Sequence, residues 1–339
     1  MQTIKDEVLH QLRSYINSAA LGAALELGLF WKLEKQPQDA ASIANRLGIP
    51  VLRCQKWLTL LKYMGYLEKV SETYIPSSKS QESILNAYSQ QTWSFLAQEA
   101  RERLPAVQDL AFHIGKPIST WAAQGLSRPN YVALMKGNPE RAQRFTRMLF
   151  EIHRPLADEL ANSLDLKGVK RLMDLGGGSG VQSFALLQRY PHLTSIVVDI
   201  QNVCVAGRKI AAELSLEERI SFYPADFLQD ELPKGFDLVL ECDVGIYNEA
   251  LFRKIRTSLN PGGRFIIVDE LVQGQNDAIS SDFTLTGRGQ VHDFLSSLED
   301  PKYESPTAMD VKAKLSQAGY ELISENTISN SMLIIQAQK

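Results

Sequence analysis

The stretch Arg171-Leu-Met-Asp-Leu-Gly-Gly-Gly-Ser-Gly180 decides the fold. A short apolar strand ends beside Asp174, turns through a cluster of glycines and opens into a helix-like run over 181–190. Glycine permits positive φ and lets a ligand approach the backbone where a β-carbon would block it. A strand-to-helix turn also points free backbone N–H groups into the crevice beyond the sheet. The stretch therefore predicts a ligand-binding turn at the start of an α/β domain.

The remainder of the C-terminal half alternates between strand and helix patterns. The expected strands are 195–200, 220–224, 237–242 and 264–270, and the expected helices are 203–214, 249–259 and 307–318. This alternation predicts a parallel sheet. Two closing strands, 320–328 and 332–337, have a short connection and should pair antiparallel. We expect a doubly wound α/β domain that is mostly parallel and has a reversed edge strand.

The N-terminal part has helical periodicity with a different organisation. Two helices are expected over 5–34, and the Ala-rich run there must be buried in its own core or against a second subunit. Between 38 and 78, a helix ends at Gly48, a second helix starts after Pro50, and a short hairpin follows. This order is typical of a winged helix.

A winged helix raises the possibility of DNA binding. The cations on its second helix are scattered and form no basic stripe, which favours a structural or dimerisation role; they are Arg53, Lys56 and Lys62. Residues 81–165 read as mostly helical and lead directly into the α/β domain, where such helices can line a pocket. The expected domains are thus 1–80, 81–165 and 166–339.

The bulk composition narrows the class of protein. The chain has 339 residues, a net charge of −3 and three cysteines without a CxxC pair, which suits a reducing cytosol and gives no reason to expect nucleic-acid binding. The N-terminus lacks the pattern of a signal peptide. The most apolar stretch, 18–31, contains Glu26 and is too short to span a membrane. We expect a cytoplasmic protein with no nucleic-acid or membrane partner.

The glycine cluster differs from two familiar nucleotide loops. No lysine follows Gly180, which excludes a Walker A loop, and Val181 stands where the dinucleotide fingerprint needs its last glycine. The motif present is an acid, Asp174, followed by alternating glycines at Gly176, Gly178 and Gly180. An acid at this position would repel a pyrophosphate and suits a ligand with a cationic ammonium group.

Acids also follow the next two strands. Asp199 is placed to accept hydrogen bonds from both hydroxyls of a ribose. Asp226 offers an acceptor for an adenine amino group, and Phe227 offers an aromatic face. Together the three strand ends describe a pocket for an amino-acid-bearing adenosine, which is S-adenosylmethionine.

With these residues the chain resembles the class I S-adenosylmethionine-dependent methyltransferases. The resemblance rests on 174–180, Asp199, 225–227 and Leu259-Asn-Pro-Gly-Gly263. Over nearly its full length the chain is similar to the two-domain small-molecule O-methyltransferases, which include plant phenolic, hydroxyindole and polyketide-tailoring enzymes and carotenoid and bacteriochlorophyll methyltransferases. The resemblance implies a Rossmann-like domain after a winged-helix domain, homodimerisation through the N-terminal domain, and no metal.

The sequence departs from that family after the fourth strand. There the family has a lysine and then a His-Asp-Trp segment whose histidine is the general base. In this chain the lysine position falls on Cys242, a cofactor-contact position, and the histidine position falls near Ile246. Tyr247 is the nearest polar residue, and Asp269 matches the family acid that orients the histidine.

The expected base is therefore absent from its usual position. A phenol needs its proton removed by a group whose pKa lies near 7. The candidates are His292, which we rank first, then His153, Tyr247 and Asp243; otherwise the acceptor ionises by itself or is an electron-rich carbon. His153 and Arg288 are further candidates for the substrate pocket, Arg288 as the partner of an acidic substrate group.

The leading hypothesis is a methyltransferase of a small aromatic or conjugated metabolite, with O-methylation favoured by the resemblance. C-methylation is the main alternative. Others are a different reaction that uses S-adenosylmethionine, and a regulator that senses this cofactor.

Overall fold

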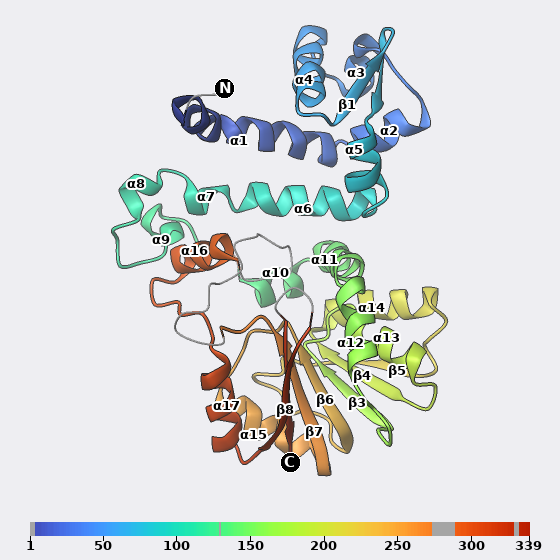
Figure 1. Ribbon diagram of the computed structural model, residues 1–339, viewed down its shortest axis with the longest axis vertical. Helices are drawn as coiled ribbons and strands as arrows, with labels where there is room; N and C mark the ends of the chain where they lie inside the picture. Colours follow the sequence, from blue (N-terminus) through green and yellow to red (C-terminus); the bar gives the residue numbers. More distant parts are fainter. Residues whose placement is uncertain (1–3, 129, 273–288, 329–331) are drawn as a thin grey trace. The chain divides into compact units, whose positions relative to one another are not determined.

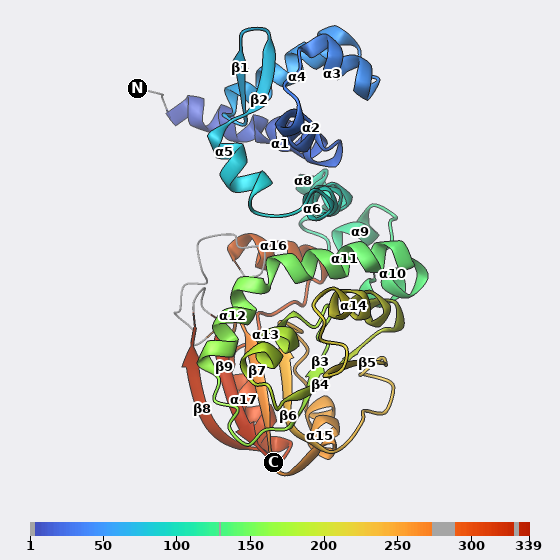
Figure 2. The same cartoon turned by 90° about the vertical axis from the view of Figure 1, so that its right-hand side faces the viewer.

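The computed structural model describes residues 4–128, 130–272, 289–328 and 332–339. Contacts divide the chain into two compact units, Met1–Pro105 and Ala106–Lys339, and each unit is described by itself (Figures 1 and 2). The boundary falls inside the segment 81–165, and the predicted division at 80 and 165 stays a prediction. Within the described residues, no helix combines enough length and apolarity to cross a lipid bilayer.

The first unit consists of helices and one small hairpin. Its elements are α1 (Ile4–Glu26), α2 (Leu29–Lys35), α3 (Ala40–Leu47), α4 (Val51–Tyr63), β1 (Leu67–Val70), β2 (Thr73–Pro76), α5 (Ser78–Ser80), the π-turn η1 (Gln81–Leu85) and α6 (Gln90–Glu102). Gly48 ends α3 with a φ of 65°, and Pro50 caps α4. β1 and β2 pair antiparallel. This order of elements supports the winged helix, which stays a prediction.

The second unit begins with a run of helices. They are α8 (Leu110–His113), α9 (Thr120–Ala123), α10 (Tyr131–Gly137), α11 (Pro139–Ile152) and α12 (Arg154–Ser163), while α7 (Leu104–Val107) crosses the boundary between the units. Asn130 caps α10 and Asn138 caps α11 through side-chain oxygens that accept backbone N–H groups. Pro155 stands in the first turn of α12, so α11 and α12 meet at His153.

A seven-stranded sheet follows. Its strands are β3 (Arg171–Leu175), β4 (Thr194–Asp199), β5 (Ile220–Pro224), β6 (Phe236–Cys242), β7 (Leu259–Asp269), β8 (Glu321–Thr327) and β9 (Leu333–Gln338), in the order β5-β4-β3-β6-β7-β9-β8. Strands β3 to β7 are parallel to one another. The predicted α/β fold class is therefore confirmed.

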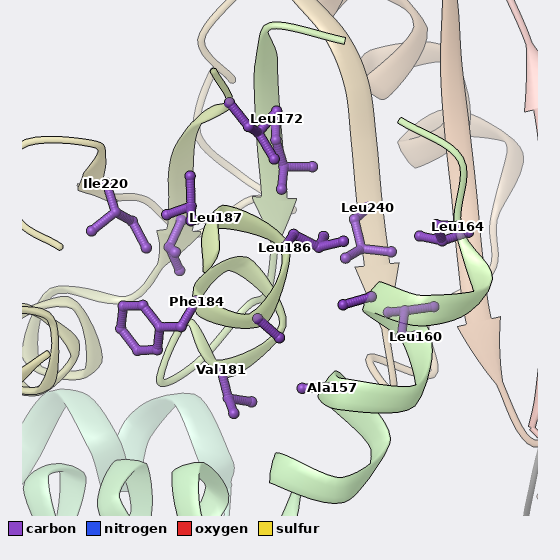
Figure 3. Packing of buried hydrophobic residues seen from close by; sticks show 14 of the residues in the cluster. Ala157, Leu160, Leu164, Leu172, Val181, Phe184, Leu186, Leu187, Ile220 and Leu240 are labelled. Carbon is purple, nitrogen blue, oxygen red and sulfur yellow. The ribbon is translucent and has the colours of Figure 1, made fainter. Parts of the chain in front are cut away.

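Helices cover both faces of the sheet (Figure 1). They are α13 (Val181–Arg189), α14 (Gln201–Glu213), α15 (Glu249–Ser258) and α17 (Ala308–Gln317). α12, α13 and α14 pack on one face, where Leu160, Phe184 and Leu240 belong to one buried cluster (Figure 3). α15 and α17 pack on the other, through Phe252 and Val311. Alternate residues of each strand thus face opposite helical layers.

The reversed strand lies one position in from the edge of the sheet. β9 pairs antiparallel with both β7 and β8, so β8 forms the edge. The residues of β9 are mostly buried, whereas those of β8 are mostly exposed. The apolar strand takes the inner position because only there do both of its faces leave water.

One helix was not expected. α16 (Gln290–Glu299) occupies a region where the sequence suggests only a glycine-containing stretch. Its N-cap is Gly289, which supplies no capping side chain, so the usual start signal is missing. Arg288 lies outside the described residues.

Candidate functional site

The polar residues of the second unit gather at the carboxyl edge of the sheet, where the parallel strands end. Asp174, Asp199 and Cys242 lie toward the layer of α13 and α14, whereas Glu241 and Asp269 lie toward the layer of α15 and α17. α11 also lies beyond this edge (Figure 2). The site therefore has two sides, one around the glycine turn and one around the ends of β6 and β7.

Asp174 is fully buried at the end of β3. The hydroxyl of Ser183 donates to its Oδ2 at 2.7 Å, and none of the described residues donates a hydrogen bond to its Oδ1. Burial raises the pKa of Asp174 to about 6, the hydrogen bonds from Ser183 oppose this shift, and the charge of Asp199 adds to it. A carboxylate oxygen left without a donor is costly inside a protein, and a cationic group is the partner that suits it.

Asp199 ends β4 and is also buried. Backbone N–H groups hold its carboxylate: Gly178 donates to Oδ2 at 3.0 Å, and Ile200 donates to Oδ1 at 2.7 Å. Burial raises the pKa of Asp199 to about 6, although both N–H groups oppose the shift. Each oxygen keeps a second lone pair, so the fixed carboxylate can still accept two hydroxyl groups.

The glycine turn requires glycine for two different reasons. Gly176 has a φ of +68°, and a β-carbon there would lie 2.8 Å from Cγ2 of Val244 and 3.5 Å from Cε1 of Phe227. A β-carbon on Gly177 would lie 2.4 Å from the carboxyl carbon of Asp174. Gly180 then caps α13 with a φ of 82°. At Gly176 and Gly177 the backbone of the turn therefore packs against neighbouring groups at distances that a side chain would prevent.

Asp226 and Phe227 follow β5 and are half-buried. Oδ2 of Asp226 accepts from Nζ of Lys136 at 3.4 Å, and its Oδ1 accepts from the backbone of Leu228 at 3.3 Å. Phe227 packs toward Gly176, so it borders the glycine turn. The sequence did not predict Lys136, which α10 brings to this acid.

Cys242 stands at the end of β6 on the same side. The amide Nε2 of Gln182, in the first turn of α13, donates to its Sγ at 3.4 Å. Burial raises the pKa of the Cys242 thiol well above its ordinary value, and the carboxylates of Asp243, Asp174 and Asp269 raise it further. Cys242 therefore stays a neutral thiol beside the glycine turn.

The other side of the site holds Tyr247 and Asp269. The hydroxyl of Tyr247 donates to Oδ2 of Asp269, and the backbone N–H of Glu270 donates to Oδ1 at 2.7 Å. Asp269 is buried at the end of β7, and Tyr247 packs against the core beneath it. The structure thus brings together the two residues that the sequence picks out here.

Sequence reasoning missed Glu241. Its side chain is 1% exposed, and its neighbours across the sheet are Leu175 and Ile267. Among the described residues, no side chain donates a hydrogen bond to its carboxyl oxygens. Burial raises the pKa of Glu241 well above its ordinary value, and the charge of Asp269 raises it further, whereas the backbone of Ile246 opposes the shift. The available signal was one acid inside the apolar run of β6.

His153 is brought to the same edge by the junction of α11 and α12. It is 9% exposed, and its Nε2 lies 3.5 Å from Oδ2 of Asp243, the first residue after β6. His292 is half-buried in the first turn of α16. That helix packs on α9, and its Asp293 accepts hydrogen bonds from the hydroxyl groups of Tyr303 and Ser305.

Comparisons with known proteins agree on one family. Residues 108–320 match the family described as O-methyltransferase domain. The 3-hydroxy-5-methyl-1-naphthoate 3-O-methyltransferase of Streptomyces sahachiroi is 32% identical over 257 residues, which cover 74% of this chain and 73% of that enzyme. The L-tyrosine C(3)-methyltransferase of Streptomyces lavendulae is 33% identical over 145 residues, 41% of this chain and 40% of that one. The solved structure of PigF with SAH has a TM-score of 0.83 at 20% identity, covering 99% of this chain and 100% of that one.

Proposed function

The chain belongs to the O-methyltransferase family, and on that premise we propose that it methylates a hydroxyl group of a small aromatic or conjugated metabolite. It is a methyltransferase, and its cofactor is S-adenosylmethionine. The observation that carries the proposal is the pair of buried carboxylates, Asp174 and Asp199, at neighbouring strand ends beside the glycine turn.

The residues present fit this cofactor. The turn at Gly176 and Gly177 leaves no room for side chains, as a closely held ligand requires. We assign Asp174 to the ammonium end of the cofactor, Asp199 to its ribose, and Asp226 with Phe227 to its adenine. Gly178, Gly180 and Cys242 complete the contact surface around the turn.

S-adenosylmethionine supplies an activated methyl group on a positively charged sulfur. The protein must hold the acceptor in line with that group and leave the acceptor atom electron-rich. We assign the first task to Tyr247 and Asp269. The hydroxyl of Tyr247 donates a hydrogen bond to Asp269, and we assign its oxygen to accept a hydrogen bond from the hydroxyl of the methyl acceptor. His292 is proposed as an additional contact of the acceptor from α16.

Methyl transfer tests this function directly. The protein is incubated with S-adenosylmethionine carrying a ¹³C methyl group and an extract of small molecules from the source cells, with Asp199→Asn as control. We expect one labelled metabolite whose ¹³C shift is that of a methyl ether, and little label with the control. If the labelled methyl group is bound to carbon, the reaction is C-methylation and the proposed O-methylation is wrong. Binding of the cofactor without any labelled product would reject the methyltransferase proposal.

We also propose that the chain forms a homodimer in the cytoplasm through its N-terminal unit. α1 carries a row of large apolar side chains that are 47–68% exposed, and these are Val8, Leu9, Leu12, Tyr15 and Ile16, called the α1 stripe below. Such a row on a helix favours a partner surface, and a second copy supplies a self-complementary one. The three cysteines are free, which supports a reducing compartment.

A further inference from the structure

Two residues from distant parts of the sequence meet beside the glycine turn. Leu149, one helical turn before His153 on α11, would lie 3.3 Å from a β-carbon on Gly178. Val244, the residue after Asp243, lies as close to Gly176, at 2.8 Å from a β-carbon there. His153 and Asp243 are thus each one step from a residue that contacts the turn. The pair of His153 and Asp243 therefore lies near the glycine turn.

An imidazole and a carboxylate approach each other in this pair. Nε2 of His153 lies 3.5 Å from Oδ2 of Asp243, and their side chains are 11% and 35% exposed. Asp243 has a φ of 55°, and its backbone N–H is fixed by the carbonyl of Val268 at 2.9 Å. Positive φ is uncommon outside glycine, and residues are held there when the surroundings demand it. The backbone directly after β6 therefore holds the carboxylate of Asp243 near His153, where α11 and α12 meet.

Other polar groups of this edge are less suited to take a proton. The hydroxyl of Tyr247 donates to Asp269, so an acidic partner already holds its proton. Cys242 is a neutral thiol, because burial and three carboxylates raise its pKa. An imidazole changes its charge near neutral pH, which is what a base for a phenol requires. Among the described residues, the charged group paired with His153 is Asp243, and the next residue, Arg154, has its guanidinium 5.8 Å from the ring centre of Phe150.

We propose that His153, oriented by Asp243, is the general base that accepts the hydroxyl proton of the methyl acceptor. This inference rests on the proposed function. In this proposal Nε2 of His153 carries the proton that faces Asp243, and the lone pair of Nδ1 takes the proton of the acceptor. The acceptor oxygen keeps its electron pair and forms the bond to the methyl carbon, while the carbon–sulfur bond breaks and its electrons go to sulfur. His153 then returns the proton to water. The sequence ranks His292 first as the base, and this assignment replaces it with His153 at the junction of α11 and α12.

Three variants test the assignment: His153→Gln, Asp243→Asn and the matched control His192→Gln, an exposed histidine of the same unit. The probe is 3-hydroxy-5-methyl-1-naphthoate, and S-adenosylhomocysteine binding is measured by calorimetry. We expect His153→Gln to lower kcat at pH 7 by about 10²-fold or more, and Asp243→Asn by about tenfold. Both should keep affinity for S-adenosylhomocysteine within about twofold, and His192→Gln should match the wild type. In His153→Gln, the acidic limb of the pH–kcat profile should disappear.

A second readout needs no acceptor. ¹⁵N NMR of labelled histidines in the full chain reports which ring nitrogen of His153 carries the proton. We expect the Nε2–H tautomer in the wild type and a mixture in Asp243→Asn. A protonated Nδ1 in the neutral ring, kcat in His153→Gln within twofold of the wild type, or a kcat loss explained by lost S-adenosylhomocysteine binding would each overturn the assignment. If the wild type does not methylate the probe, the proposed acceptor class fails for that compound, and the tautomer alone decides the role of His153.

Discussion

The roles that we propose for Asp174 and Asp199 predict that cofactor binding depends on pH. Burial raises the pKa of each to about 6, so each carboxyl is protonated below that pH and ionised above it. A ligand that needs the ionised forms therefore binds more tightly as pH rises through 6. We expect the association constant of S-adenosylhomocysteine to increase between pH 5 and pH 7 in calorimetric titrations.

Asp199→Asn isolates the share of Asp199 in this effect. The amide keeps the shape, offers only one acceptor oxygen and cannot ionise, so affinity at pH 7 should fall by about 1.5–3 kcal/mol and the pH dependence should flatten in part. Asp158→Asn, on the exposed side of α12, is the matched control and should bind as the wild type does. Unchanged affinity in Asp199→Asn would remove this residue from the cofactor site.

Glu241 is a buried carboxyl group in the core of the sheet, and its ionisation should destabilise the fold. No side chain in the described part of the protein donates a hydrogen bond to its carboxyl group, and its pKa is raised well above the ordinary value. The folded state therefore binds a proton that the unfolded state releases, and stability falls as pH rises from the ordinary pKa of glutamate toward the raised one. We expect Glu241→Gln, which cannot ionise, to be more stable than the wild type at pH 8 by about 1–3 kcal/mol, with a smaller difference at pH 5.

Urea unfolding at the two pH values measures this difference. Glu218→Gln, an exposed residue of the same unit, is the control and should change stability by less than about 0.5 kcal/mol at either pH. A Glu241→Gln protein that is less stable at pH 8 would mean that the ionised carboxylate has a stabilising partner.

At the scale of elements, the strand–turn–helix unit around Gly176 combines a backbone requirement with a steric one. An alanine there must adopt a φ near +68° and place its β-carbon 2.8 Å from Val244. Gly168 has only the backbone requirement: its φ is +83°, but no atom of the described residues would lie within 4 Å of a β-carbon there. We expect Gly168→Ala to lose about 1 kcal/mol of stability and keep cofactor binding.

Gly176→Ala should lose at least as much stability and also weaken S-adenosylhomocysteine binding by tenfold or more, because Val244 must shift. Thermal unfolding and calorimetry on both variants provide the comparison. Equal binding by the two variants would show that the close packing at Gly176 does not shape the site.

Elements were predictable where one local pattern governs them. The apolar run of β3 ends where the sequence indicates, because this strand is buried between helical layers. α16 was missed because Gly289 gives no capping signal. The acids at the ends of β3 and β4 could be predicted from position alone. The meeting of His153 with Asp243 could not, since it depends on how α11 crosses the edge of the sheet, and no local pattern encodes that crossing.

At the scale of the whole molecule, the two units contribute different functions. The second unit holds every residue that we assign to the cofactor and acceptor, and the first unit carries the α1 stripe. Large apolar side chains exposed on consecutive turns of one helix are unfavourable in water, and burying them against a second copy removes that cost.

The α1 stripe therefore predicts the oligomeric state. Light scattering after size exclusion should give twice the chain mass for the wild type. Leu12→Glu, at the centre of the stripe where the side chain is 66% exposed, should shift the protein toward the monomer, because a carboxylate cannot enter an apolar interface without a partner. Met309→Glu on α17, 68% exposed, is the matched control and should leave the mass unchanged. A monomeric wild type, or a Leu12→Glu protein that stays dimeric at the same concentration, would place the subunit contact elsewhere or remove it.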